Sequence, residues 1–156
     1  RKNKWCGNMF GKEGECCVKT CCEKYSDWLF LVFRVVVGLM FAVHGAQKFG
    51  IIGNGNISGF ASMFGLPLWL AVIAGLIELL GGILITLGLF TRIAAIFTSI
   101  QMIAALAIAH FPKGWNPFAN GGELALLYLA AFFVLIGFGG GKYSLESLFC
   151  KDKSEH

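Results

Sequence analysis

The chain has 156 residues, of which 56% are hydrophobic and 14% charged, and its formal net charge is +4. Soluble domains carry about 25% charged residues, so this composition excludes an ordinary water-soluble domain and indicates an integral membrane protein. The positive charge is better explained by membrane topology than by nucleic-acid binding, and we expect no nucleic-acid partner.

Four apolar runs follow one another along the chain, near residues 28–49, 67–90, 92–111 and 122–138. Each is close to the ~20 residues that a helix needs to cross the hydrocarbon core. Helices are the expected form because they satisfy their own backbone hydrogen bonds in lipid. We therefore predict an all-α integral membrane four-helix bundle over residues 27–142. A cysteine-rich N-terminal tail, 1–26, and a C-terminal tail, 143–156, flank this domain.

Local signals refine these helices. Asp27 can cap a first helix that starts at Trp28, and Pro67 opens the second helix at a position that tolerates proline. In the loop between them, one helix face is outlined by Ile57, Phe60 and Phe64, which predicts a short helix lying flat on the outer membrane surface. Small residues let helices approach closely, so we expect a packing role alone for Gly75, Gly81, Gly82 and Gly88.

Basic residues fall mostly on one side of the predicted membrane. Four crossings place both termini on the same side, which then carries ten basic residues: Arg1, Lys2, Lys4, Lys12, Lys19, Lys24, Arg92, Lys142, Lys151 and Lys153. The other side carries only Lys48 and Lys113. Because Lys and Arg concentrate in cytoplasmic segments, we predict a multi-pass protein with both termini in the cytoplasm.

Polar side chains also lie inside the predicted membrane helices, where ionisable groups are costly and usually face the interior with a partner. They are Arg34, His44, Lys48, Glu78 and Glu123, with Gln101 and His110 as further polar groups. The three basic residues of the first helix share one face, because each residue turns a helix by ~100°. Depths counted at ~1.5 Å per residue predict Glu78 near Arg34, and Glu123 near Lys48.

Two interpretations of these residues stay open. In the first, Arg34–Glu78 and Lys48–Glu123 are ion pairs that hold the helices together. In the second, the polar residues line a pocket, open to the outer leaflet, that binds a small polar or quinone-like head group. His44 suits proton exchange in such a pocket because an imidazole titrates near neutral pH.

Several short motifs resemble the DoxX family of small four-helix membrane proteins. They are HGAQKF at 44–49, FGLP at 64–67, ELLGGILITLGLFTR at 78–92, NGGELALLYL at 120–129 and GFGGGKYSLE at 137–146. The resemblance covers roughly residues 28–146, and the polar positions of the family correspond here to His44, Lys48, Glu78 and Glu123.

The DoxX resemblance carries two implications for function. The family includes relatives of the membrane subunit of thiosulfate:quinone oxidoreductase, which implies redox-linked membrane work beside other subunits. It also reaches towards small-molecule-binding and chaperone-like membrane proteins, so a non-enzymatic function stays open.

The N-terminal tail departs from the family pattern by its cysteines. All six cysteines of the chain lie on one side of the predicted membrane: Cys6, Cys16, Cys17, Cys21, Cys22 and Cys150. Their spacing matches no familiar zinc or ferredoxin motif, and a reducing cytoplasm disfavours stable disulfides. A thiolate site for zinc or an iron–sulfur cluster, a redox-active thiol pair, lipid attachment, exoplasmic disulfides and no specific role all stay open.

These observations predict a small or accessory subunit of a quinone- or thiol/sulfur-linked membrane redox system, at most an oxidoreductase subunit. We expect quinone in the membrane pocket and zinc or an iron–sulfur cluster as the candidate cofactor of the tail. The expected partners are the lipid bilayer and either other subunits or further copies of this chain. In the alternative, the chain is a non-catalytic membrane binding, assembly or chaperone-like factor whose buried charges are structural.

Overall fold

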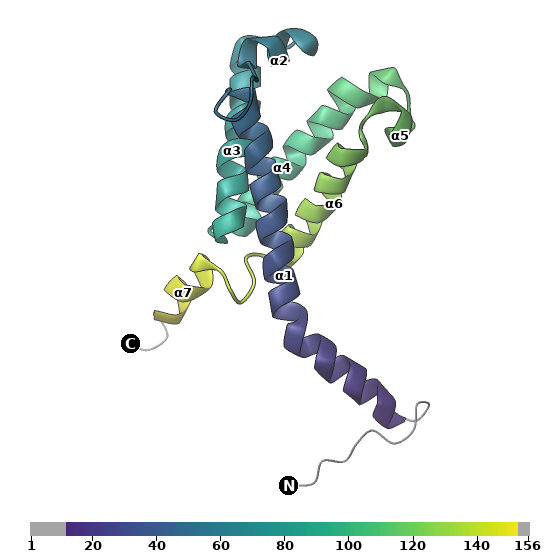
Figure 1. Cartoon of the computed structure of the whole chain (residues 1–156), viewed down its shortest axis with the longest axis vertical. Helices are drawn as coiled ribbons and strands as arrows, with labels where there is room; N and C mark the ends of the chain where they lie inside the picture. The colour runs from purple at the N-terminus through teal and green to yellow at the C-terminus, as the bar shows by residue number, and fades with distance from the viewer. Residues whose placement is uncertain (1–11, 153–156) are drawn as a thin grey trace.

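The computed structural model describes the backbone of residues 12–152 and the side chains of residues 25–149, and this part of the chain is all helices and turns (Figure 1). The predicted all-α fold is confirmed for these residues. The elements are α1 Lys12–Lys48, α2 Ile57–Met63, α3 Leu68–Leu87, α4 Thr91–Ala105, the π-helical turn η1 Leu106–His110, the 3-10 turn η2 Phe111–Lys113, α5 Pro117–Asn120, α6 Glu123–Phe138 and α7 Leu145–Asp152.

Three described segments are long and apolar enough to cross a membrane. They are Tyr25–Lys48, Leu68–Leu87 and Thr91–Lys113, with 24, 20 and 23 residues. The next apolar helix, α6, has 16 residues, or ~24 Å at ~1.5 Å per residue, which is shorter than the ~30 Å hydrocarbon core. The helices thus indicate a multi-pass membrane protein, and a fourth crossing by α6 stays a prediction.

The first helix is longer than its apolar run. It begins at Lys12, so the predicted start at Trp28 is wrong. Asp27 lies inside the helix and, instead of capping it, forms an ion pair with Lys142, with 3.3 Å between Nζ and Oδ2. The segment before Trp28 contains a single glycine after Lys12 and no proline, so it lacks the residues that most oppose a helix. The predicted boundary of the tail, 1–26, stays a prediction.

The remaining helices begin and end close to their predicted positions, and four short elements are added to them. The predicted short helix is present as α2, and Asn56 caps it by accepting a hydrogen bond from the backbone N–H of Ser58 at 2.9 Å. Its position on the outer membrane surface stays a prediction. The third long segment is not α-helical throughout, because it passes through η1 and η2 near its end. The short helices α5 and α7 have no counterpart among the predicted elements, and α7 lies within the predicted C-terminal tail.

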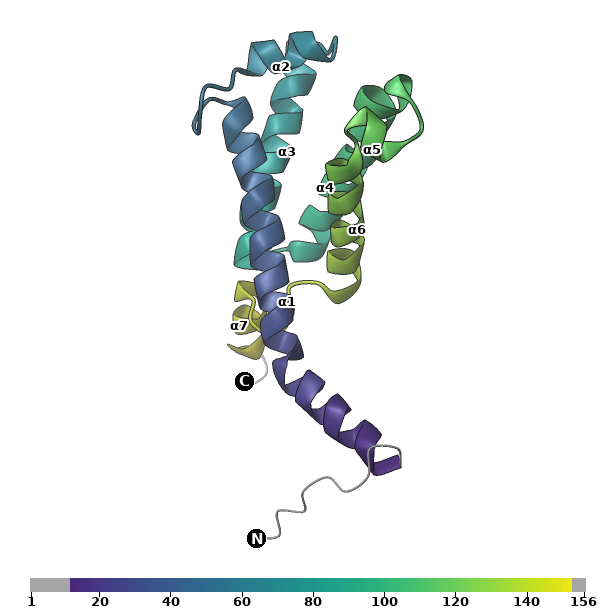
Figure 2. The same ribbon diagram turned by 45° about the vertical axis from the view of Figure 1, so that its right-hand side comes forward.

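The helices α1, α3, α4 and α6 form two antiparallel pairs. α1 packs mainly on α3, and α4 packs mainly on α6. Figure 1 shows the two pairs meeting near the short α3–α4 turn and diverging toward the end that carries α2 and α5. Figure 2 shows the same divergence from another side, with α7 and the first turns of α1 at the opposite end. The cavity described below lies between these two pairs.

Glycines bring α1 and α3 into backbone contact. Gly38 and Gly45 of α1 face Gly82 and Gly75 of α3, so the glycines stand seven residues apart on both helices. A Cβ atom added to Gly38 would lie 2.8 Å from the Gly82 carbonyl oxygen, and one added to Gly45 would lie 2.9 Å from the Gly75 carbonyl oxygen. Since real Cβ atoms do not come this close, the contact requires glycine, and the expected packing role is confirmed for Gly75 and Gly82. Gly88 has another role, because it ends α3 in the left-handed conformation, with φ +70°.

An aromatic cluster connects α1 with α6. Phe41 of α1 contacts Tyr128 and Phe132 of α6, with ring centroids 5.2 Å and 4.8 Å away. Phe41 and Phe132 are almost completely buried, at 1% and 0% exposure. Such edge-to-face and tilted ring pairs add about 0.5–1.5 kcal/mol beyond their buried area. The cluster therefore holds the two helix pairs together on one side of the cavity.

Candidate functional site

A cavity of about 520 Å³ lies between the two helix pairs, and we call it the central cavity. Its walls come from α1, α2, α3, α4, η1 and α6, and they are mostly apolar. Aromatic rings stand on several sides of it, from Phe41, Phe60, Phe64, Phe97 and Tyr128. The volume falls within the ~300–1,000 Å³ range that is usual for small-molecule sites.

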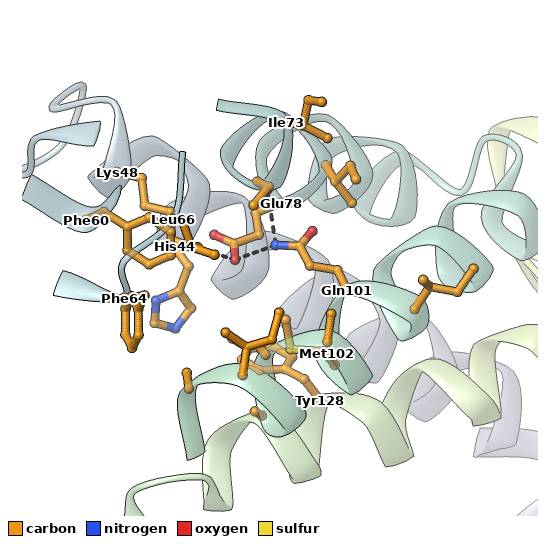
Figure 3. A pocket seen from close by; sticks show the side chains of 18 of the residues that line it. His44, Lys48, Phe60, Phe64, Leu66, Ile73, Glu78, Gln101, Met102 and Tyr128 are labelled. Carbon is orange, nitrogen blue, oxygen red and sulfur yellow. Dashed lines mark hydrogen bonds and ion pairs between the residues drawn. The ribbon is translucent and has the colours of Figure 1, made fainter. Parts of the chain in front are cut away.

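The polar part of the central cavity is a hydrogen-bonded group from three helices (Figure 3). Lys48 of α1 forms an ion pair with Oε1 of Glu78 on α3. Gln101 of α4 donates from Nε2 to the same oxygen at 2.8 Å and to the carbonyl oxygen of Ala74 at 3.1 Å. The side chains of Glu78 and Lys48 are only 6% and 17% exposed, so water screens their attraction weakly. We call Lys48, Glu78 and Gln101 the polar triad.

Helix α2 covers the Lys48 side of the central cavity. The ammonium group of Lys48 lies 4.2 Å from the ring centroid of Phe60, which is a cation–π distance. Phe64, just past the end of α2, also lines the cavity and stacks at an angle on Phe60, with 5.1 Å between ring centroids. The predicted outer surface helix thus forms part of the site.

His44 and Tyr128 stand beside the polar triad (Figure 3). Their rings meet edge to face, with 5.9 Å between centroids. Tyr128 was not among the predicted pocket residues, although the sequence contained one signal for it. It is a tyrosine within the otherwise apolar run of α6, and a buried tyrosine hydroxyl usually requires a hydrogen-bond partner.

Three buried polar atoms of the cavity walls have no hydrogen-bond partner among the described residues. They are Oε2 of Glu78, Oε1 of Gln101 and the hydroxyl oxygen of Tyr128. Buried side-chain polar atoms are nearly always paired in proteins. All three residues line the central cavity, so the site has hydrogen-bonding capacity that the described side chains leave unused.

The π-helical turn η1 forms part of the wall of the central cavity. It ends at His110, whose Nδ1 lies 3.1 Å from the carbonyl oxygen of Asn120. Because a carbonyl only accepts, Nδ1 carries the proton in this contact. His110 lines the central cavity as predicted, and π-helical turns are frequent at functional sites.

The predicted ion pairs are wrong. Lys48 pairs with Glu78 rather than with Glu123, which is exposed at the start of α6 and does not line the central cavity. Glu78 likewise has no contact with Arg34, which lies outside the cavity and hydrogen-bonds to backbone carbonyls. Of the seven predicted pocket residues, the structure brings together His44, Lys48, Glu78, Gln101 and His110.

The pairing differs from the prediction because α1 and α3 do not end at the same level. A Cβ atom on Gly75 would lie 2.9 Å from the ring of Phe49, the residue after the end of α1. Gly75 is seven residues after Leu68, the start of α3, so α3 extends ~10 Å beyond α1 at ~1.5 Å per residue. Depths counted from the helix ends therefore placed Glu78 too far from Lys48.

Arg34 connects several segments at the end of the bundle where the two helix pairs meet. Its side chain is 2% exposed. Nη1 donates to the carbonyl oxygen of Ile85 in the last turn of α3 at 3.2 Å, and Nη2 donates to that of Tyr143 at 2.8 Å. The C-terminal end of a helix carries a partial negative charge that favours such a cation. Arg34 thus links α1 both to the end of α3 and to the segment before α7.

We expect Arg34→Met to loosen the segment 139–147 and to lower thermal stability. The substitution removes two hydrogen bonds from a charged donor, each worth about 1.5–3 kcal/mol. Hydrogen exchange of the purified chain in detergent should show faster exchange in this segment. The matched control is Arg92→Met, because Arg92 is exposed and makes one long bond of 3.4 Å to Gly137. Equal exchange rates in both variants would contradict the structural role of Arg34.

The cysteine predictions fall mostly outside the described side chains. Cys6 lies outside the described residues altogether. The helical backbone of α1 includes Cys16, Cys17, Cys21 and Cys22, and that of α7 includes Cys150. Among the described side chains, no group of three or more His, Cys, Asp or Glu residues could hold a metal ion. The thiol, zinc and iron–sulfur interpretations of the tail stay predictions.

Comparison with known proteins agrees with the sequence motifs. The DoxX family model matches residues 29–111. A Haemophilus influenzae protein described as uncharacterized is 40% identical over 132 residues, which are 83% of this chain and 96% of that protein. A Bacillus subtilis protein named "Putative oxidoreductase CatD" is 33% identical over 123 residues, 79% of this chain and 88% of that protein.

A more distant relative is named for its location. The Escherichia coli protein "Inner membrane protein YqjF" is 28% identical over 131 residues, 83% of this chain and 98% of that protein. No solved structure matches the chain. The family model covers more than half of the 156 residues, and the three long apolar helices agree with a membrane location. The chain is an integral, multi-pass membrane protein and belongs to the DoxX family.

Proposed function

We propose that the chain is a small or accessory subunit of a quinone- or thiol/sulfur-linked membrane redox system, with a quinone-like ligand in the central cavity. The observation that carries this proposal is the central cavity itself, which joins aromatic walls to the polar triad and His44. Flat, apolar ligands with polar ring substituents suit such a site, because apolar walls bury the ring and a few polar groups orient it. The name of the Bacillus subtilis relative agrees with redox work.

The chemistry proposed for the cavity is binding with proton exchange. His44 is half-buried and lines the cavity near Glu78, Lys48 and Tyr128. An imidazole takes up and releases protons near neutral pH. Protons must enter or leave when a quinone changes oxidation state, and His44 is our candidate for the group that exchanges them. The electron donor and acceptor would belong to partner subunits or to the cysteine tail.

We expect His44→Ala to weaken ligand binding by about tenfold, in line with the loss of one buried polar contact. The measurement is calorimetric titration of the chain in lipid nanodiscs with a decyl-tailed benzoquinone, in the oxidised form and, without oxygen, in the reduced form. The matched control is Val43→Ala on the neighbouring position of α1, because Val43 is exposed toward the outside of the bundle. Absence of binding by both forms, or equal binding by all three proteins, would contradict the proposal.

The topology proposal accompanies this function. We place α6 as the fourth crossing and both termini in the cytoplasm, supported by the excess of basic residues on that side. The first turns of α1 and the helix α7 lie at the same end of the molecule (Figure 1), as an even number of crossings requires. The cysteine tail would then meet cytoplasmic thiols, sulfur compounds or metal ions.

A second candidate function is a non-catalytic membrane binding, assembly or chaperone-like factor. The observation that favours it is the polar triad, which connects α1, α3 and α4 directly. In this case the charged residues serve stability alone. Their replacement would then lower thermal stability without altering the titrations described above.

A further inference from the structure

The unused hydrogen-bonding atoms of the central cavity differ in kind from one another. Gln101 directs Nε2 at two acceptors, the Ala74 carbonyl oxygen and Oε1 of Glu78. Both amide hydrogens are therefore occupied, and this fixes which end of the amide is free. The free atom is Oε1, which has no partner among the described residues and can only accept a hydrogen bond.

Glu78 presents a second acceptor. Its Oε1 takes the contacts of Lys48 and Gln101, while Oε2 is buried without a partner. In the ion pair with Lys48 the carboxyl group is a carboxylate, which has no hydrogen to donate. The third unused group, the hydroxyl of Tyr128, can either donate or accept. Besides the further N–H groups of Lys48, the buried atoms without a partner among the described residues are thus two acceptors and one group of either kind.

A ligand that donates hydrogen bonds fits this set of atoms. The carbonyl oxygens of a quinone only accept, so they would leave both acceptors unpaired and would face a carboxylate oxygen. The hydroxyl groups of the reduced ring donate to those same atoms. A cationic amine would also donate, but the ammonium group of Lys48 already balances the charge of Glu78 and would repel a second cation.

We propose that the central cavity binds the reduced, dihydroxy form of an aromatic ligand in preference to its oxidised, dione form. One ring hydroxyl donates to Glu78 Oε2 or to Gln101 Oε1. The ring packs among Phe41, Phe60 and Tyr128, which line the same cavity. This inference rests on the proposed function and specifies the oxidation state that the site selects.

The test compares three ligands on the full chain in lipid nanodiscs without oxygen. They are a decyl-tailed hydroquinone, the corresponding quinone and the dimethyl ether of the hydroquinone, which keeps the ring and tail but cannot donate. We expect the hydroquinone to bind about tenfold tighter than the quinone or the ether. Neither of those two ligands can donate a hydrogen bond, so both leave the buried acceptors unpaired, which weakens their binding. Binding of none of the three would contradict the proposed function itself. If the quinone or the ether binds as tightly as the hydroquinone, or more tightly, the inferred preference is wrong while the proposed ligand site still stands.

Two substitutions assign the preference to the acceptors. In Glu78→Gln the new amide can donate to a quinone carbonyl, so the ratio of hydroquinone to quinone affinity should fall toward one. In Tyr128→Phe the lost hydroxyl serves either form, so both affinities should fall and their ratio should stay as in the original chain. An unchanged ratio in Glu78→Gln, or an equal change of the ratio in Tyr128→Phe, would contradict the role of the acceptors. The comparison of three ligands on the original chain decides the proposal even where a variant does not fold.

Discussion

Gly82→Leu is expected to separate α1 from α3 and to lower the stability of the chain strongly. A Cβ atom at Gly82 would lie 2.6 Å from the carbonyl oxygen of Gly38 and 2.8 Å from the Cα atom of Ala42. Both are backbone atoms, which cannot turn away as a side chain can. Overpacking a core costs about 1–3 kcal/mol, and we expect the upper end or more here. At ~2–4 °C per kcal/mol for a chain of this size, the melting temperature should fall by roughly 6–12 °C.

The measurement is the melting temperature of the purified chain in detergent, followed by circular dichroism. Gly137→Leu is the matched control, because a Cβ atom at Gly137 would meet nothing within 4 Å. Leucine is the better helix former by about 0.5–1 kcal/mol, so this control should melt at the same or a slightly higher temperature. If Gly82→Leu has the same melting temperature as the original chain, the backbone contact between α1 and α3 is not present in the protein.

Lys48→Met is expected to destabilise the chain more than the double substitution Lys48→Met with Glu78→Leu. The single change leaves a buried carboxylate without its partner, and breaking a buried ion pair in this way costs about 3–5 kcal/mol. Replacing both members with apolar residues of similar size is often neutral or stabilising. The four proteins of this cycle should therefore show strongly non-additive melting temperatures.

Lys113→Met is the control for the loss of a lysine at the same end of the molecule, since Lys113 is exposed. It should leave the melting temperature close to that of the original chain. Effects of the Lys48 and Glu78 substitutions that add within about 0.5 kcal/mol would show that the two side chains do not interact.

The double variant also separates the two candidate functions. Stable protein that no longer binds the hydroquinone would favour a ligand site, and stable protein with unchanged binding would favour a structural role.

The family and the membrane class follow from the sequence because both depend on local features. A run of apolar residues of the right length must be a helix in lipid, whatever lies beside it. The same reasoning identified the interior residues: a histidine, lysine, glutamate or glutamine within such a run is costly unless it faces the interior. His44, Lys48, Glu78 and Gln101 were found in this way, and all four line the central cavity.

The partner of each interior residue was decided by the tertiary structure. Lys48 meets Glu78 because paired glycines set how far α3 extends past α1, and this relative height of two helices is not encoded at either residue. Tyr128 joins the site because Phe41 and Phe132 bring α6 against α1. Arg34 donates hydrogen bonds to carbonyl groups rather than to a carboxylate, because the last turn of α3, with its carbonyl oxygens, lies beside it. The sequence by itself determined which side chains must avoid lipid, since that depends on the chemistry of each residue. Only the packing of distant segments decided which of them meet and form a site.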